Sequence, residues 1–83
     1  MTRVITAIFN PTTAISYQLS SHGMTTLKVY NVIGREVASL VNEVKDAGVY
    51  AVQFDASKLV SGIYFSTLQS GSNTQIKKLI LVK

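Results

Sequence analysis

The sequence predicts an all-β fold, an antiparallel sandwich or barrel of short strands. Two patterns indicate this fold class. Apolar and polar residues alternate with a period of two in segments 15–19, 27–30 and 50–54, which is typical of half-buried strands. Turn-forming residues separate these segments at short intervals. The 83 residues are 47% hydrophobic and 14% charged, a composition that excludes a disordered chain and suits one small domain over 1–83.

The strands follow one another along the chain. Segments 14–19, 26–31 and 48–55 alternate clearly, whereas segment 62–69 alternates less cleanly, as expected of a strand with contacts on both faces. Pro11 precedes the first clear strand, where its missing N–H costs no ladder bond. Gly34 lies in a turn at 31–35, where it suits a positive φ. We expect a core that includes Ile15, Tyr17, Leu27, Val29, Tyr50, Val52, Phe54, Tyr64, Leu68 and Leu79.

Segment 36–45 does not alternate. Val37, Leu40, Val41 and Val44 have the spacing of an amphipathic helix. A lone helix between hairpins would need a partner, and the sequence shows no second helix. We therefore expect a strand over 36–41 followed by a loop.

A glycine precedes a tyrosine by two residues in "AGVY" and again in "SGIY". Gly48 and Gly62 would allow a sharp entry into a strand. Tyr50 and Tyr64 could form aromatic platforms for a ligand, but an architectural role is favoured, because a buried ring can tie its hydroxyl to the backbone, as in the tyrosine corner of Ig-like sandwiches.

Residues for catalysis or metal binding are scarce. The acids are Glu36, Glu43, Asp46 and Asp55, and nothing places two of them on one face. Asp55 has a turn context in which its side chain would accept local backbone N–H groups. The single His22 lies in a Ser/Gly turn with no nucleophile motif, and the chain has no cysteine. We therefore expect no enzyme activity, no metal site and no cofactor.

The net charge of +4 does not indicate nucleic-acid binding, because the cations are scattered and no nucleic-acid-binding motif accompanies them. Only Lys77, Lys78 and Lys83 cluster, in the terminal "IKKLILVK". This segment could be an edge strand whose lysines oppose aggregation. It could also be a signal that a receptor binds through backbone pairing, with Leu79 and Leu81 facing inward and the lysines in solvent.

The segments "FNPTTAISYQL", "TTLKVYNVIGREVASLVNE", "AGVYAVQFDASKLVSGIYF" and "KKLILVK" together resemble one family. It is the type A C-terminal sorting domain of the type IX (Por) secretion system, related to the Ig-like domain of flagellar hook-capping proteins. The resemblance implies an Ig-like, fibronectin III-like sandwich of about seven strands, with "GREVASLVN" as a strand. Its terminal motif matches Lys77, Lys78, Leu79, Ile80, Leu81, Val82 and Lys83, and its structural motif positions are Asn10, Pro11, Gly34, Gly48, Tyr50, Asp55, Gly62 and Tyr64.

The resemblance also implies a function. Such a domain directs an N-terminal cargo protein from the periplasm through the outer-membrane translocon to the surface or medium, where a sortase-like peptidase removes it. Many members carry a longer "YPNPFNPTT" block, so residues 1–8 match poorly and are either a leader or a first strand.

Two further expectations concern binding. An accessory sandwich module that binds carbohydrate or protein beside a secreted enzyme is the alternative function, and Tyr30 and Phe65 are the candidates for its aromatic platform. Exposed sheet edges also make self-association an expected property.

Overall fold

The computed structural model describes residues 4–9 and 11–82, and these form seven strands without a helix. The all-β prediction is therefore confirmed. In chain order the strands are β1 (Val4–Phe9), β2 (Thr12–Leu19), β3 (Gly23–Asn31), β4 (Glu36–Lys45), β5 (Gly48–Asp55), β6 (Gly62–Ser70) and β7 (Asn73–Leu81).

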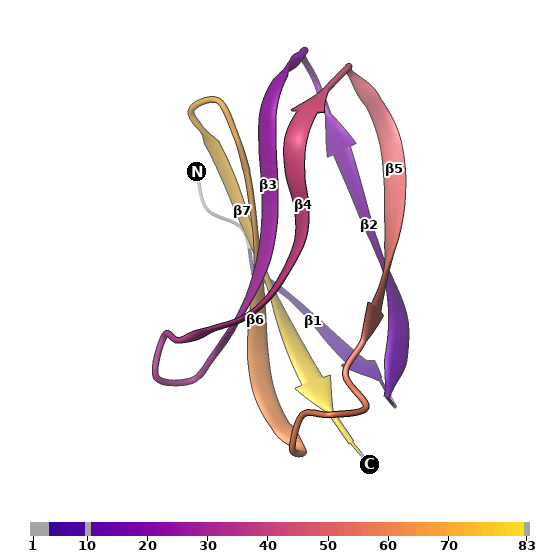
Figure 1. The fold of residues 1–83 in the computed structure, drawn as a ribbon, viewed down its shortest axis with the longest axis vertical. Helices are drawn as coiled ribbons and strands as arrows, with labels where there is room; N and C mark the ends of the chain where they lie inside the picture. The colour runs from indigo at the N-terminus through magenta and orange to yellow at the C-terminus, as the bar shows by residue number, and fades with distance from the viewer. Residues whose placement is uncertain (1–3, 10, 83) are drawn as a thin grey trace.

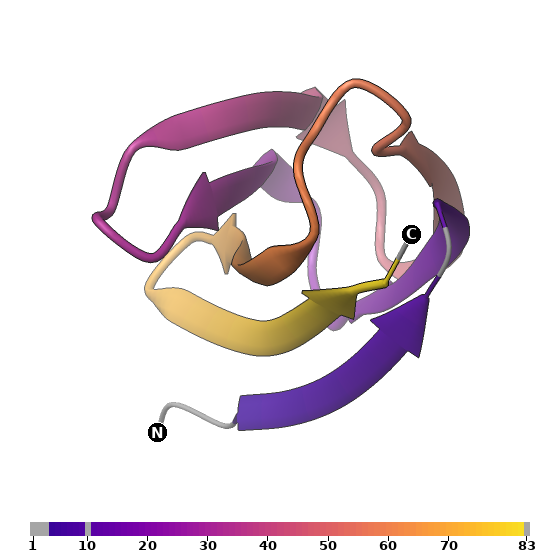
Figure 2. The same ribbon diagram turned by 90° about the horizontal axis from the view of Figure 1, so that it is seen from below.

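The strands form two layers. One sheet has five strands in the order β1-β7-β6-β3-β4, and the other pairs β2 with β5. Figure 1 shows β2 and β5 beside the larger sheet, and the end-on view in Figure 2 shows the strands surrounding a common interior. Neighbours are antiparallel except for β1 and β7, which run parallel. The arrangement is the expected sandwich.

The core lies between the two sheets and uses one face of each strand from β2 to β7. Most of the expected core is confirmed, because eight of the expected side chains are buried and two, Tyr50 and Val52, pack against them while partly buried. The core also contains residues beyond that expectation: Leu19, Val41, Ala56 and Leu81. No buried side-chain nitrogen or oxygen of the described residues lacks a hydrogen-bond partner.

Strand β4 continues to Lys45, so the loop expected after Val41 is wrong. Its register against β3 slips twice: Leu27 faces Val41 but Lys28 faces Ser39, and Val29 faces Ala38 but Tyr30 faces Glu36. Each slip leaves one extra residue on β4, which is a β-bulge. These bulges break the period of two and produce the helix-like spacing of apolar residues.

Residues 4–9 form strand β1, which pairs with β7 from Val4 opposite Ile76 to Phe9 opposite Leu81. Behind β1, the carbonyl of Pro11 accepts a hydrogen bond from the backbone N–H of Ala56 at 3.0 Å. This bond ties the start of β2 to the loop between β5 and β6. Asn10, expected to be part of the structural motif, lies outside the described residues.

Candidate functional site

Two corners of the same geometry begin β5 and β6. Gly48 has φ +154° and Gly62 has φ +155°, a backbone conformation that other residues rarely adopt. The Tyr50 hydroxyl donates to the carbonyl of Asp46 at 2.8 Å, and the Tyr64 hydroxyl donates to the carbonyl of Val60 at 2.7 Å. Each tyrosine therefore bonds to the backbone four residues earlier and secures the turn before its strand.

Polar side chains also hold the β3–β4 turn and the β5–β6 loop in place. Gly34, with φ +83°, donates its N–H to the carbonyl of Asn31 at 3.0 Å. The Asn31 side-chain oxygen accepts the N–H groups of Ile33 and Arg35 at 3.1 and 3.0 Å. In the β5–β6 loop, the Asp55 carboxylate accepts the N–H of Ser57 at 2.9 Å. Both loops consequently have defined shapes.

The terminal strand β7 is paired on both sides. Over 76–81 it pairs with β1 in parallel and with β6 in antiparallel fashion. It is therefore not an edge strand, and this rules out the alternative that its lysines protect an exposed edge. A receptor also cannot add a strand to this segment in the folded domain unless β1 or β6 first leaves, because both rows of backbone groups are already used.

The inner face of β7 contributes to the core and carries one of the lysines. Leu79 and Leu81 are buried, as expected. Lys77 lies on the same face and is half-buried, and its Nζ donates to the carbonyl of Ser16 on β2 at 2.6 Å. Lys77 thus links the two sheets, which corrects the expectation that it points only into solvent.

The outer face of β7 places its other residues on the exterior of the five-stranded sheet. Lys78 lies opposite Phe65 of β6, and Phe65 lies opposite Tyr30 of β3. All three side chains are half-buried. The two candidate platform residues are therefore direct neighbours. Val82 follows the strand with 49% of its surface exposed, and Lys83 lies outside the described residues.

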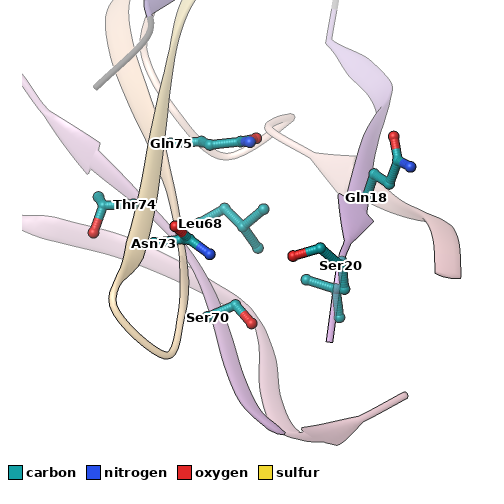
Figure 3. A pocket seen from close by; sticks show the side chains of 8 residues that line it. Gln18, Ser20, Leu68, Ser70, Asn73, Thr74 and Gln75 are labelled. Carbon is teal, nitrogen blue, oxygen red and sulfur yellow. The ribbon is translucent and has the colours of Figure 1, made fainter. Parts of the chain in front are cut away.

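The gap between β2 and the start of β7 contains a polar hollow of about 260 Å³. Figure 3 shows Gln18 and Ser20 on one side and Ser70, Asn73 and Gln75 on the other, while Thr74 points away. Amides and hydroxyls line it together with two leucines, and none of its lining residues titrates near neutral pH. This hollow offers hydrogen bonds but no acid, base or nucleophile of adjusted pKa.

The charged residues form pairs at the surface. His22 Nδ1 lies 2.7 Å from Asp46 Oδ1, Lys28 Nζ lies 3.3 Å from Glu36 Oε1, and Lys45 Nζ lies 3.0 Å from Glu43 Oε1. In these three pairs each carboxylate lies beside a basic side chain. In the described ranges, no three His, Asp or Glu side chains cluster in a way that could hold a metal ion.

Aromatic stacking joins β2 to β5 beside one of these pairs. The Tyr17 and Tyr50 rings stack with centroids 5.4 Å apart, and Lys45 Nζ lies 4.5 Å from the Tyr50 ring centroid. Burial raises the pKa of the Tyr17 hydroxyl above its ordinary value. The hydrogen bond to the Glu43 carboxylate raises the pKa of the Lys45 ammonium. These groups stabilise the folded chain.

The family model of the secretion system C-terminal sorting domain matches residues 9–83. The chain belongs to this family. It is a sorting domain of type IX secretion, a domain whose role is not catalytic. A sorting domain of this type marks a protein that is secreted or displayed at the cell surface. No individual curated protein matches the chain at a significant level.

Several features of this sorting domain were not predicted from its sequence. The hydrogen bond from Lys77 of β7 to Ser16 of β2 joins residues that are sixty-one positions apart in the sequence, and no local pattern indicates it. The His22–Asp46 contact also joins two separate turns. By contrast, the apolar residues in the turn "NVIG" are visible in the sequence, since such positions usually hold polar residues or glycine.

The described residues contain no helix long and apolar enough to cross a membrane.

Proposed function

We propose that this sorting domain occupies the C-terminal end of a longer exported protein and directs that cargo from the periplasm through the outer-membrane translocon. A sortase-like peptidase then removes the domain at the cell surface. The family match over residues 9–83 carries this proposal. The integration of β7 into the larger sheet supports it, because only a completed fold positions the terminal residues on one surface.

The side chains on the outer face of β7 are the part of the terminal motif that a translocon can contact in the folded domain. Lys78 and Ile80 lie there, and Val82 follows at the chain end. Leu79 and Leu81 are buried, so their role is to hold the strand in place. Lys77 holds β7 to β2 through Ser16. The motif therefore divides into residues that fold the domain and residues that we propose the translocon binds. Lys83 lies outside the described residues and is assigned to the second group by its charge alone.

An export assay tests this function. The domain is fused behind a signal peptide and a reporter and expressed in a host with the type IX apparatus. We expect the wild-type fusion at the surface or in the medium. A fusion without residues 77–83 should stay in the periplasm, and the variant with Lys78→Gln and Lys83→Gln should also be retained, because it keeps the apolar residues of the motif but loses two lysine charges.

Two controls separate recognition from folding. Lys28→Gln removes a cation of the same sheet that pairs with Glu36, and its export should be normal. Resistance to protease must show that the lysine variant is folded. Export of the folded Lys78→Gln, Lys83→Gln variant at the normal rate would exclude these lysines from the signal. Export of the fusion without residues 77–83 would refute the sorting function of the domain itself.

A further inference from the structure

The β3–β4 turn and the β5–β6 loop lie toward one end of the sandwich, the lower end in Figure 1. Four aliphatic side chains on these loops and at the start of β6 are exposed. Val32 and Ile33, in the β3–β4 turn, are 67% and 81% exposed, and Val60, in the β5–β6 loop, is 77% exposed. Ile63, at the start of β6, is 37% exposed. Turns normally carry polar residues or glycine at such positions, and the core does not use these side chains. Their exposure has no explanation in the stability of the fold.

A hollow of about 460 Å³ lies between the two loops. The four exposed residues line it together with the partly buried Val37 and Leu59, and Tyr64 also contributes to its wall. Lys58 is its only charged lining residue. A concave, mostly apolar space of this size accommodates one or more side chains of a partner. We call Val32, Ile33, Lys58, Val60 and Ile63 the loop-end surface.

Hydrogen bonds hold both loops of this surface in place. Asn31 accepts from the N–H groups of Ile33 and Arg35, so the turn that carries Val32 and Ile33 is fixed at both ends. The Tyr64 hydroxyl bonds to the carbonyl of Val60 itself. An apolar surface that is ordered before binding loses less conformational entropy when a partner arrives.

The loop-end surface is continuous with the outer face of β7. Ile63 lies directly opposite Ile80 in the β6–β7 register, and the neighbouring pair on that face is Phe65 with Lys78. A partner that covers the loop-end surface would therefore also reach the exposed residues of the terminal motif. The two features form one contact area at the end of the domain where β7 ends.

We propose that the loop-end surface docks a protein component of the export machinery, which inserts an apolar side chain into the hollow and places carboxylates beside Lys58 and the exposed Arg35. This inference rests on the proposed function and names the contact surface for it. The charge supports such a partner, because no acidic side chain lines the hollow and exposed cations attract an acidic surface. Complementary charge also guides the approach of the two proteins.

A protein partner fits the loop-end surface better than a lipid membrane or a second copy of this chain does. Proteins bind a lipid surface through protruding apolar residues, with aromatic residues at the interface. The exposed residues of the loop-end surface are instead aliphatic and surround a concavity. A second copy of the chain would bring a second Lys58 and Arg35 to the same contact, which opposes association.

Single substitutions with a matched control test the proposal. Ile33→Asp and Val60→Asp place a charge on the loop-end surface. Val49→Asp is the control, because Val49 is 76% exposed, against 77% for Val60, and is the second residue of β5, at the opposite end of the molecule. Binding of the full chain is measured to outer-membrane vesicles from cells that carry the type IX translocon. Vesicles from a strain without it, and liposomes made from lipids of the same membranes, serve as comparisons.

We expect the wild type and Val49→Asp to bind translocon-containing vesicles equally, and Ile33→Asp and Val60→Asp to bind at least about tenfold more weakly. Lys58→Glu should also weaken binding, whereas Lys58→Arg should retain it. Thermal unfolding must show that each variant is folded. Unchanged binding of both Asp variants would overturn the proposal.

The control vesicles, the liposomes and light scattering distinguish a lipid membrane or a second copy of the chain from the proposed protein partner. Equal binding to vesicles without the translocon, or to liposomes, would replace the protein partner by a lipid surface. Dimers that the Asp variants abolish, measured by light scattering, would assign the surface to a second copy. If the wild-type fusion is exported and the Ile33→Asp and Val60→Asp fusions are exported equally, the docking inference fails while the sorting function stands.

Discussion

Gly62 enters β6 with φ +155°, and no heavy atom lies within 4 Å of the position that a Cβ would take. A side chain there would meet open space, so only the backbone conformation opposes substitution. Gly48 differs, because its Cβ would contact the Tyr50 ring at 3.7 Å. A substitution of Gly62 therefore measures the energetic cost of the positive φ at the start of β6, without a steric clash.

We expect Gly62→Val to lower the free energy of unfolding by about 1–3 kcal/mol, because a β-branched residue is strained at this φ. Gly23→Val is the control: Gly23 also has open space around its Cβ, but it has no positive φ. Urea denaturation of both variants measures the difference. Equal unfolding midpoints for Gly62→Val and the wild type would show that the corner does not need a glycine.

At the scale of single elements, β1 is the outermost strand of the larger sheet on the side of β7. It covers the edge of β7 over 76–81, and without it β7 would expose its backbone groups to other chains. An unpaired edge of this kind promotes association through strand pairing. The expected self-association stays a prediction for the full chain, because β1 and β4 border the larger sheet and β2 and β5 pair only with each other.

Deletion of residues 1–9 tests the role of β1. We expect the shortened chain to unfold at lower urea concentration, because β7 loses one of its two partners, and to form dimers or larger species at concentrations where the full chain does not. Light scattering across a wide concentration range compares the two. A shortened chain that stays monomeric throughout would contradict the role of β1 as the cover of this edge.

The elements also show which parts of the fold the sequence could predict. Strands β2, β3 and β5 alternate strictly, and most of their inward residues were predicted because each position depends only on the local period; Leu19 of β2 is a core residue that the expected core did not include. The extent of β4 was predicted wrongly, because its two bulges shift Val37 and Leu40 out of the period of two. The parallel partner of β1 lies about seventy residues away along the chain, so no local pattern indicates that pairing. The two tyrosine corners, by contrast, were visible as a repeated local motif.

The candidate site follows the same division. The alternation of β7 predicted that Leu79 and Leu81 face inward, and the structure confirms it. The same alternation places Lys77 on the inner face, but only the position of β2 gives its ammonium the Ser16 carbonyl as an acceptor. The loop-end surface needs three elements, since its hollow forms only when the β3–β4 turn meets the β5–β6 loop and the start of β6. The sequence alone shows its apolar residues but not their convergence.

For the molecule as a whole, stability at alkaline pH depends on a contact among three strands. Tyr17 of β2 stacks on Tyr50 of β5, and Lys45 of β4 lies over the Tyr50 ring. The pKa of Tyr17 is raised from its ordinary 10.0 by burial, with Glu43 and Tyr50 acting in the same direction and Lys45 against them. The pKa of Lys45 is raised from its ordinary 10.5, first by its hydrogen bond to Glu43.

Both shifts have the same consequence for folding. A raised pKa means that the folded chain holds the proton more tightly than the unfolded chain, so unfolding releases protons at high pH. The contribution to stability is complete below the ordinary pKa values near 10 and is lost as the pH rises through the higher values of the folded state. We expect the free energy of unfolding to be nearly constant from pH 7 to about pH 9 and to fall above about pH 10.

In Tyr17→Phe the fall should be smaller, because the phenylalanine ring keeps the stacking area but has no proton to lose. Urea denaturation followed by circular dichroism at each pH measures this, and it avoids the change that ionisation causes in tyrosine fluorescence. If Tyr17→Phe and the wild type lose stability equally between pH 9 and pH 11, the burial of the Tyr17 hydroxyl does not contribute to alkaline unfolding.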